Sequence, residues 1–112
     1  MTLSIAGRCA RTGQFGIAIS SSSPAVAARC AWVRAGVGAA CTQNITDPRL
    51  GTRLLDLMAE GRSAREAMEA VVESEPLIGF RQLSAIDANG GTAMWSGHGT
   101  LGLYATATGP DC

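Results

Sequence analysis

The 112-residue sequence contains no lysine, a single histidine and no long hydrophobic run. Without lysine, no side-chain amine is available as a tunable general base or for a Schiff base, so any mechanism that needs one must use another group. No apolar stretch approaches membrane-spanning length, and no basic leader precedes an apolar segment. We therefore expect a protein without a membrane segment and, by default, a cytoplasmic location.

Neither sign of charge predominates along the chain. Nine acidic residues balance nine arginines, and no stretch concentrates like charges. Surfaces that bind nucleic acids or anionic membranes need clustered basic residues, so we expect neither partner. Aromatic residues make up 4% of the chain and are scattered, which favours core or interface positions over a base-stacking platform.

The metal-ligating residue types are too sparse and too widely spaced for a metal or redox centre. Cys9, Cys30, Cys41 and Cys112 form no C-x-x-C pattern, and the first three lie in apolar, alanine-rich surroundings typical of buried thiols. His98 has no partners at ligand spacing. The glycine-rich stretches also lack the phosphate-loop and dinucleotide patterns. We therefore expect no metal and no cofactor.

Two hydrophobic stretches at the start of the chain predict a β-hairpin. They span residues 2–10 and 14–23, and Thr12-Gly13 between them suits a tight turn. Residues 25–44 could begin as a helix because of their alanines, but Gly36 and Gly38 favour extended chain in the second part. There we predict a third, largely buried strand, Val37–Thr42.

Residues 47–75 carry the strongest local signals and predict two helices. Asp47 can cap the first, Pro48 suits its first position, and Gly61 can end it. Ser63 and Glu66 form a capping box for the second, which stops before Pro76. Their apolar positions recur at helical spacing: Leu50, Leu54, Leu57 and Met58 in the first, and Ala64, Ala67, Met68, Val71 and Val72 in the second.

After the helices, the pattern returns to strands. Residues 80–87 and 92–97 flank the turn sequence Ala-Asn-Gly-Gly, a strong hairpin marker. The resulting order, β-β-β-α-α-β-β, predicts an α+β layered fold. A sheet this rich in glycine and alanine needs cover on both faces, which two helices cannot supply. We therefore expect residues 1–112 to form a single partial domain, completed by a second chain or a missing segment.

The order of the motifs resembles that of a known family. "MTLSI", a Thr-Gly turn, a Gly-x-Ala strand running into serines, "RAGVGA", "TQ", "PRLG" and "RQLSAIDANGG" follow one another. This resembles the N-terminal half of an uncharacterised bacterial family, domain of unknown function family 1028, with an N-terminal-nucleophile (Ntn) hydrolase-like fold. The resemblance covers nearly the whole chain.

Several expectations follow from this resemblance. The fold would be an Ntn-hydrolase-like αββα sandwich to which this chain contributes part. The activity would be hydrolysis of a C–N amide bond in a small molecule or peptide. The partner would be a second chain from the same precursor, with autoproteolysis after Cys112 as one route to it, in a hetero- or homo-oligomer. The alternative is a noncatalytic binding or assembly subunit of the same fold.

Thr2, His98 and Cys112 are the candidate catalytic residues. In a nucleophile-first mechanism, an N-terminal hydroxyl attacks the amide carbonyl and its own α-amine, ordinarily with a pKa of about 7.7–8.0, accepts the proton. Thr2 meets the positional requirement once Met1 is removed, although an ordinary strand-edge threonine is the alternative. His98 suits a general base, yet a lone loop histidine is usually structural. Cys112 follows a Pro-Asp turn and marks either a processing junction or a truncation.

The candidate substrate-binding residues are Ser21, Ser23, Gln43 and Asn44. The serines belong to the run Ser20–Ser23, which the resembled fold brings close to the start of the first strand. The two amides lie between a glycine-rich strand and a capped helix, where they could orient a carbonyl or hold an oxyanion. The alternatives are a polar strand end for the serines and a loop-shaping role for Asn44.

Overall fold

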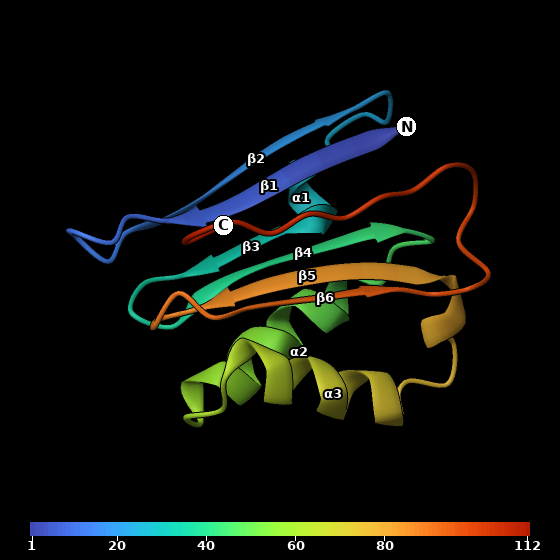
Figure 1. Ribbon diagram of the computed structural model, residues 1–112. Helices are drawn as coiled ribbons and strands as arrows, with labels where there is room; N and C mark the ends of the chain where they lie inside the picture. Colours follow the sequence, from blue (N-terminus) through green and yellow to red (C-terminus); the bar gives the residue numbers. More distant parts are fainter.

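The computed structural model describes residues 1–112, and its elements are arranged in layers (Figure 1). Two long helices cover one face of a four-stranded antiparallel sheet, and a two-stranded antiparallel hairpin lies over the other face. With a third, short helix, this is an α+β fold, as the element order predicted. No helix of the chain combines the length and the apolar character needed to cross a membrane.

The hairpin consists of β1 (Thr2–Arg8) and β2 (Phe15–Ser21). Its register pairs Thr2 with Ser21 at one end and Arg8 with Phe15 at the other. The turn between them uses Gly13, whose φ of 73° is a left-handed conformation that favours glycine. The predicted hairpin is therefore confirmed. One detail was wrong: Cys9 is exposed in the turn and not buried in apolar surroundings.

The alanine-rich segment forms more structure than the single strand predicted for it. A short helix, α1 (Ala27–Cys30), leads into β3 (Ala31–Arg34), which turns at Gly36 into β4 (Gly38–Asn44). The sequence-based prediction of one strand missed β3. Alanine propensity is outweighed there because the turn at Gly36 sets Ala31–Arg34 in antiparallel register with Gly38–Cys41.

The two long helices are α2 (Pro48–Ala59) and α3 (Ala64–Ser74), close to their predicted bounds. The Asp47 carboxylate accepts a hydrogen bond from the Arg49 backbone N–H at 3.0 Å, which satisfies an otherwise unpaired donor of the first turn. The capping box of Ser63 and Glu66 is formed in both directions. Both predicted N-terminal caps are thus confirmed.

The second half of the sheet follows these helices. A 3₁₀ turn, η1 (Ile78–Phe80), leads into β5 (Arg81–Asp87), and β6 (Thr92–Ser96) returns after the predicted Asn-Gly turn. The strand order is β3-β4-β5-β6, so β4 and β5 are central. Asp87 is buried and accepts hydrogen bonds from three backbone N–H groups, those of Ala64, Asn89 and Gly91. It therefore joins the β5–β6 turn to the start of α3.

The hydrophobic core lies between the two long helices and the four-stranded sheet. Leu54, Val71 and Leu83 are 0%, 0% and 2% exposed. Full burial of such a side chain contributes roughly 1.5–3 kcal/mol. Packing is tight: Gly51 of α2 lies against the Trp32 indole with no room for a Cβ atom. The members of this core cluster are Ala40, Leu50, Leu54, Leu55, Met58, Ala64, Ala67, Met68, Val71, Leu83 and Ala85.

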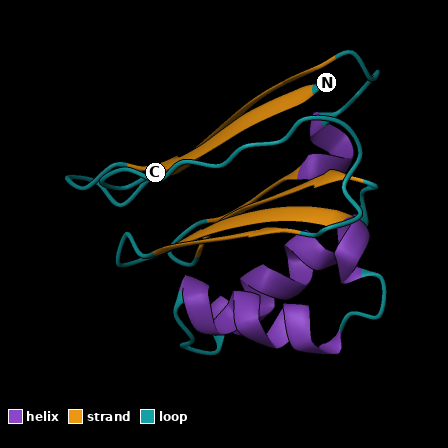
Figure 2. Cartoon of the chain, turned by 45° about the vertical axis from the view of Figure 1, so that its right-hand side comes forward, coloured by secondary structure: helices purple, strands orange, loops and turns teal.

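After β6 the chain forms no further helix or strand, and residues 97–112 run back along the hairpin (Figure 2). The segment is fixed near its start by Asn44, whose side-chain oxygen accepts from the Leu101 N–H at 2.8 Å. It is fixed near its end by an ion pair of 2.8 Å between Arg8 and Asp111. We call residues 101–111 the strap.

Candidate functional site

A cavity of about 830 Å³ lies between the hairpin and the four-stranded sheet. β1 forms one wall, β4, β5 and β6 form the opposite wall, and the strap contributes residues 103–108. Figure 1 shows the strap passing between the hairpin and the sheet, toward the Arg8 end of β1. A cavity of this volume is in the range that holds small molecules in proteins.

Thr2 lies at one end of this cavity. Its Oγ1 is 2.9 Å from Ser21 Oγ, across the first rung of the hairpin. The Ser21 hydroxyl also accepts from the Ser23 backbone N–H at 3.1 Å, and the α-amine of Met1 is 3.5 Å from Ser22 Oγ. The serine run therefore does surround the start of β1, as expected. Of the predicted binding residues, Ser21 contacts Thr2 directly, whereas exposed Ser23 contributes only its backbone.

The middle of the cavity contains a second polar group of contacts around Ser4. The Gln43 side-chain amide donates to Ser4 Oγ across the space between the hairpin and the sheet. Cys41, two residues before Gln43 on β4, is buried, and burial raises the pKa of its thiol, although hydrogen bonds with Ser4 and Ser84 act in the opposite direction. The thiol therefore stays protonated near neutral pH, when it is a poor nucleophile.

A pair of glutamines faces the cavity from neighbouring strands. Gln43 of β4 and Gln82 of β5 are directly opposite in the sheet register, and Gln82 is opposite Ser96 of β6. The Gln82 Nε2 donates to Ser96 Oγ at 3.2 Å. Sequence reasoning did not select Gln82, Ser4 or Ser84. The alternation of polar and apolar residues in "RQLSAID" could have identified two of them, because it assigns Gln82 and Ser84 to one face of β5.

No charged side chain lines this cavity. Its lining combines hydroxyl and amide groups with apolar side chains such as Ile86 and Met94, and the α-amine of Met1 lies at the Thr2 end. The arrangement can hold an uncharged molecule by hydrogen bonds and apolar contact. It offers a hydroxyl nucleophile at one end and no side-chain carboxylate or imidazole to act as a base.

Of the other predicted site residues, Asn44 and His98 lie outside the cavity and Cys112 borders it. Asn44, with a φ of 72°, bonds through both side-chain amide atoms to the backbone of Leu101, so it fixes the strap. His98 is exposed in the loop after β6, beside Gly79. Cys112 borders the cavity beyond Asp111, at the Arg8 end of β1. Thr2 begins that strand and Arg8 ends it, so Thr2, His98 and Cys112 are not brought together.

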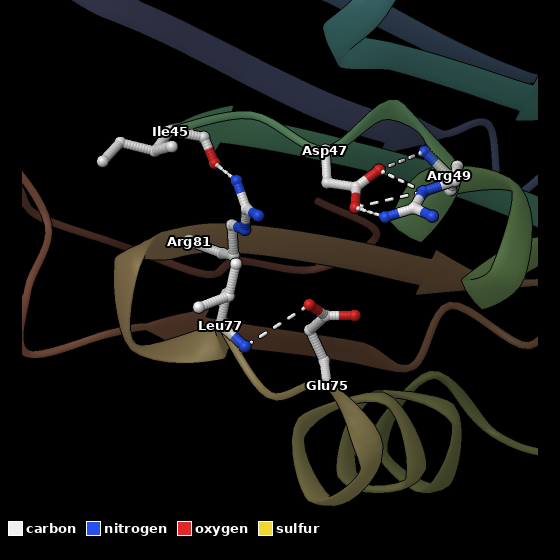
Figure 3. A network of polar contacts seen from close by, with 6 residues as sticks. All are labelled: Ile45, Asp47, Arg49, Glu75, Leu77 and Arg81. Atoms are coloured by element: carbon white, nitrogen blue, oxygen red, sulfur yellow. Dashed lines mark hydrogen bonds and ion pairs between the residues drawn. The ribbon is translucent and has the colours of Figure 1, made fainter.

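A separate polar cluster lies at the start of α2 (Figure 3). Asp47 is buried and forms an ion pair of 2.6 Å with Arg49, and hydrogen bonding from this guanidinium lowers the pKa of the carboxyl. Arg81, also buried, donates to the Ile45 carbonyl, and Glu75 accepts from the Leu77 N–H at 3.4 Å. These contacts stabilise the loops next to α2, α3 and β5. Nowhere in the chain do three or more His, Cys, Asp or Glu residues gather as a metal site would require.

Comparison with known proteins gives a structural match and a family match. The crystal structure of a protein from Silicibacter pomeroyi superposes with a TM-score of 0.93 at 22% identity, over 98% of this chain and 49% of that one. At this identity the match shows the fold alone, and the chain spans about half the length of that protein. No curated protein matches the sequence.

The family match covers almost every residue. The model described as "Family of unknown function (DUF1028)" matches residues 2–112. Apart from Met1, this range includes every motif on which the resemblance was based, and the solved structure is assigned to the same family model. The chain therefore belongs to the DUF1028 family.

Proposed function

We propose that this chain is part of an Ntn-hydrolase-like amide hydrolase, with Thr2 as the nucleophile once Met1 has been removed. The observation that carries the proposal is the Thr2 hydroxyl, held 2.9 Å from Ser21 Oγ at the end of the 830 Å³ cavity. Met1 is 97% exposed, so an aminopeptidase can reach it. The contact with Ser21 orients the Thr2 hydroxyl, which favours attack in a fixed direction.

The reaction needs only groups that the amino terminus supplies. The Thr2 oxygen bonds to the amide carbonyl carbon while the freed α-amine takes the hydroxyl proton. Collapse breaks the C–N bond, the leaving amine receives that proton, and the acyl group stays on Thr2 as an ester. Water then attacks the ester, which releases the carboxylic acid and restores the hydroxyl. Lysine is not needed, and the sequence has none.

The proposed αββα layering adds a second helical layer over the hairpin. β1 alternates, so Thr2, Ser4 and Ala6 face the cavity while Leu3 and Ile5 face outward, 74% and 58% exposed. Exposed apolar side chains on a flat sheet face favour cover by another layer. A second chain from the same precursor, made by cleavage after Cys112, would supply it in the cytoplasm, where free thiols such as the four here persist.

Turnover by the complete gene product tests the proposal. We would measure release of aminomethylcoumarin from a panel of acyl amides, for the wild type and for Thr2→Ala, Thr2→Ser, Cys112→Ala and the exposed helix control Thr52→Ala. Loss of the nucleophile should reduce kcat/KM about a thousandfold or more, whereas Thr2→Ser should retain activity. Full turnover by Thr2→Ala would sink the Thr2 assignment. An intact mass that splits after Cys112 without added protease would support autoproteolysis.

The second candidate is a noncatalytic assembly subunit, favoured by the same outward residues Leu3 and Ile5. In that case the hairpin face would bind another chain, as a hetero- or homo-oligomer, and no amide would be cleaved. Native light scattering beside the turnover assay separates the two. A stable oligomer that fails to cleave any amide in the panel, with Met1 removed, would favour the assembly role.

A further inference from the structure

The residues that line the cavity indicate which class of substrate it can bind. Its lining includes no Asp, Glu, Lys, Arg or His side chain, although it is bounded by strands from both sheets and by the strap. A charged ligand group buried there would lose its hydration without meeting an opposite charge from any side chain, which disfavours its binding. The lining therefore favours ligands whose buried part carries no charge.

The two glutamines, Gln43 and Gln82, offer hydrogen-bond acceptors to a ligand in the cavity. Gln43 and Gln82 are cross-strand partners, and each uses its Nε2 on a protein hydroxyl, that of Ser4 and that of Ser96 respectively. Neither Oε1 accepts a hydrogen bond within the chain and neither is a buried unpaired atom, so each is an accessible free acceptor on a residue that lines the cavity. Two adjacent carbonyl oxygens are acceptors suited to an amide N–H.

Apolar side chains lie farther along the same face of the sheet as this pair. Ile86 and Met94 lie on the same face of the sheet, and Ala6 faces them from β1. An amide next to an aliphatic group would thus place its polar atoms against the glutamines and its carbon atoms against these side chains. The fixed partners Ser4 and Ser96 hold both glutamine side chains in position before the ligand arrives, which reduces the entropy lost on binding.

We infer that this cavity recognises a neutral, amide-bearing aliphatic group, with Gln43 and Gln82 accepting its N–H hydrogens, and that it rejects charged analogues. The inference rests on the proposed function, because it names the class of substrate for the same site. It concerns binding, which can be measured without turnover.

The experiment uses the complete gene product carrying Thr2→Ala, so that no probe is consumed. Three related probes carry different charges: N-acetyl-leucinamide is neutral, N-acetyl-leucine has a carboxylate in place of the primary amide and is an anion, and leucinamide lacks the acetyl group and is a cation. Affinities are measured by ligand-observed NMR titration. We expect the neutral probe to bind about tenfold or more tightly than either charged one.

Variants of the two glutamines then test whether these residues are responsible for the preference for the neutral probe. Gln82→Met and Gln43→Met keep side-chain volume but remove the acceptor, and each should weaken the neutral probe about fivefold to tenfold. Gln82→Glu should shift preference toward leucinamide. Gln14→Met, in the exposed β1–β2 turn, is the matched control and should change nothing. Thermal melting of each variant verifies that it is folded.

Two results would overturn the inference: equal affinity for all three probes, or equal effects of Gln82→Met and Gln14→Met. These outcomes are independent of the nucleophile test. Selective binding of the neutral probe in a protein that never cleaves amides would leave the pocket assignment standing and remove the hydrolase. Turnover that depends on Thr2 but not on Gln43 or Gln82 would support the hydrolase and remove the role given to the two glutamines.

Discussion

The two faces of the four-stranded sheet differ in composition, although the same strands supply both. On β5, Leu83 and Ala85 point into the core beneath α2 and α3, whereas Gln82 and Ser84 point into the cavity beneath the hairpin. The helix side is apolar and closely packed, while the cavity side is open and combines polar with apolar side chains. Period-two alternation therefore separates the face that stabilises the fold from the face available for binding.

The elements that cover these faces differ in the same way. The two long helices bury large side chains, and their N-terminal ends are capped or hydrogen-bonded by Asp47, Ser63 and Asp87. The strap over the cavity is held at Leu101 and Asp111, and no backbone group of residues 102–108 forms a hydrogen bond within the chain. Local opening should accordingly be easier on the cavity side.

The largest effect is expected from a cavity-creating change on the helix side. Leu54 is 0% exposed at the centre of the core, so Leu54→Ala should lower the free energy of unfolding by about 3–5 kcal/mol. The control is Leu77→Ala, at a side chain 53% exposed after α3, which should cost about 0.5 kcal/mol or less. Urea denaturation measures both. Similar losses in the two variants would contradict the assignment of the core to this face.

A smaller effect is expected where the helix layer meets the sheet turn. Asp87→Ala removes the acceptor for the N–H groups of Ala64, Asn89 and Gly91, and we expect a loss of about 2–3 kcal/mol, because buried donors are left unpaired. Asp56→Asn is the control, since that carboxylate is 58% exposed in its ion pair with Arg34. Hydrogen exchange should accelerate at the three amides. Unchanged exchange there would refute the role given to Asp87.

Local sequence signals predicted the helix side well. Each of these signals depends on only a few neighbouring residues, and the structure contains all of them: the caps at Asp47 and Ser63, the apolar residues at helical spacing and the Asn-Gly turn. The extra strand β3 was missed because its formation depends on pairing with β4, and not on the helix propensity of the alanine-rich segment that contains it. Local propensity is a weak guide where tertiary pairing decides.

The candidate site was predictable only in part. The contact between Thr2 and Ser21 follows from the hairpin register, which the turn sequence fixes. The meeting of Gln43 with Ser4 joins two different sheets, and no local pattern specifies how those sheets pack. The roles of Asn44 and Asp111 in holding the strap likewise depend on residues 57 and 103 positions apart, respectively.

The smallest effect is a difference between two thiols, one at the hairpin turn and one in the cavity. A hydrogen bond from Thr12, with a smaller contribution from the Arg8 charge, lowers the pKa of Cys9, whereas burial raises that of Cys41. Because the thiolate is the form that reacts, alkylation of Cys9 should begin at lower pH than that of an ordinary thiol, and alkylation of Cys41 at higher pH.

Iodoacetamide labelling followed by peptide mass spectrometry, over a range of pH, measures both thiols in one sample. Thr12→Val should move the Cys9 midpoint upward, because the hydrogen bond that favours its thiolate is lost, and should leave Cys41 unchanged. Thr52→Val on the exposed face of α2 should move neither. If Cys41 in the folded protein were labelled at the same pH as Cys9, the wall of the cavity at β4 would be open to solvent, and the contrast between turn and cavity would fail.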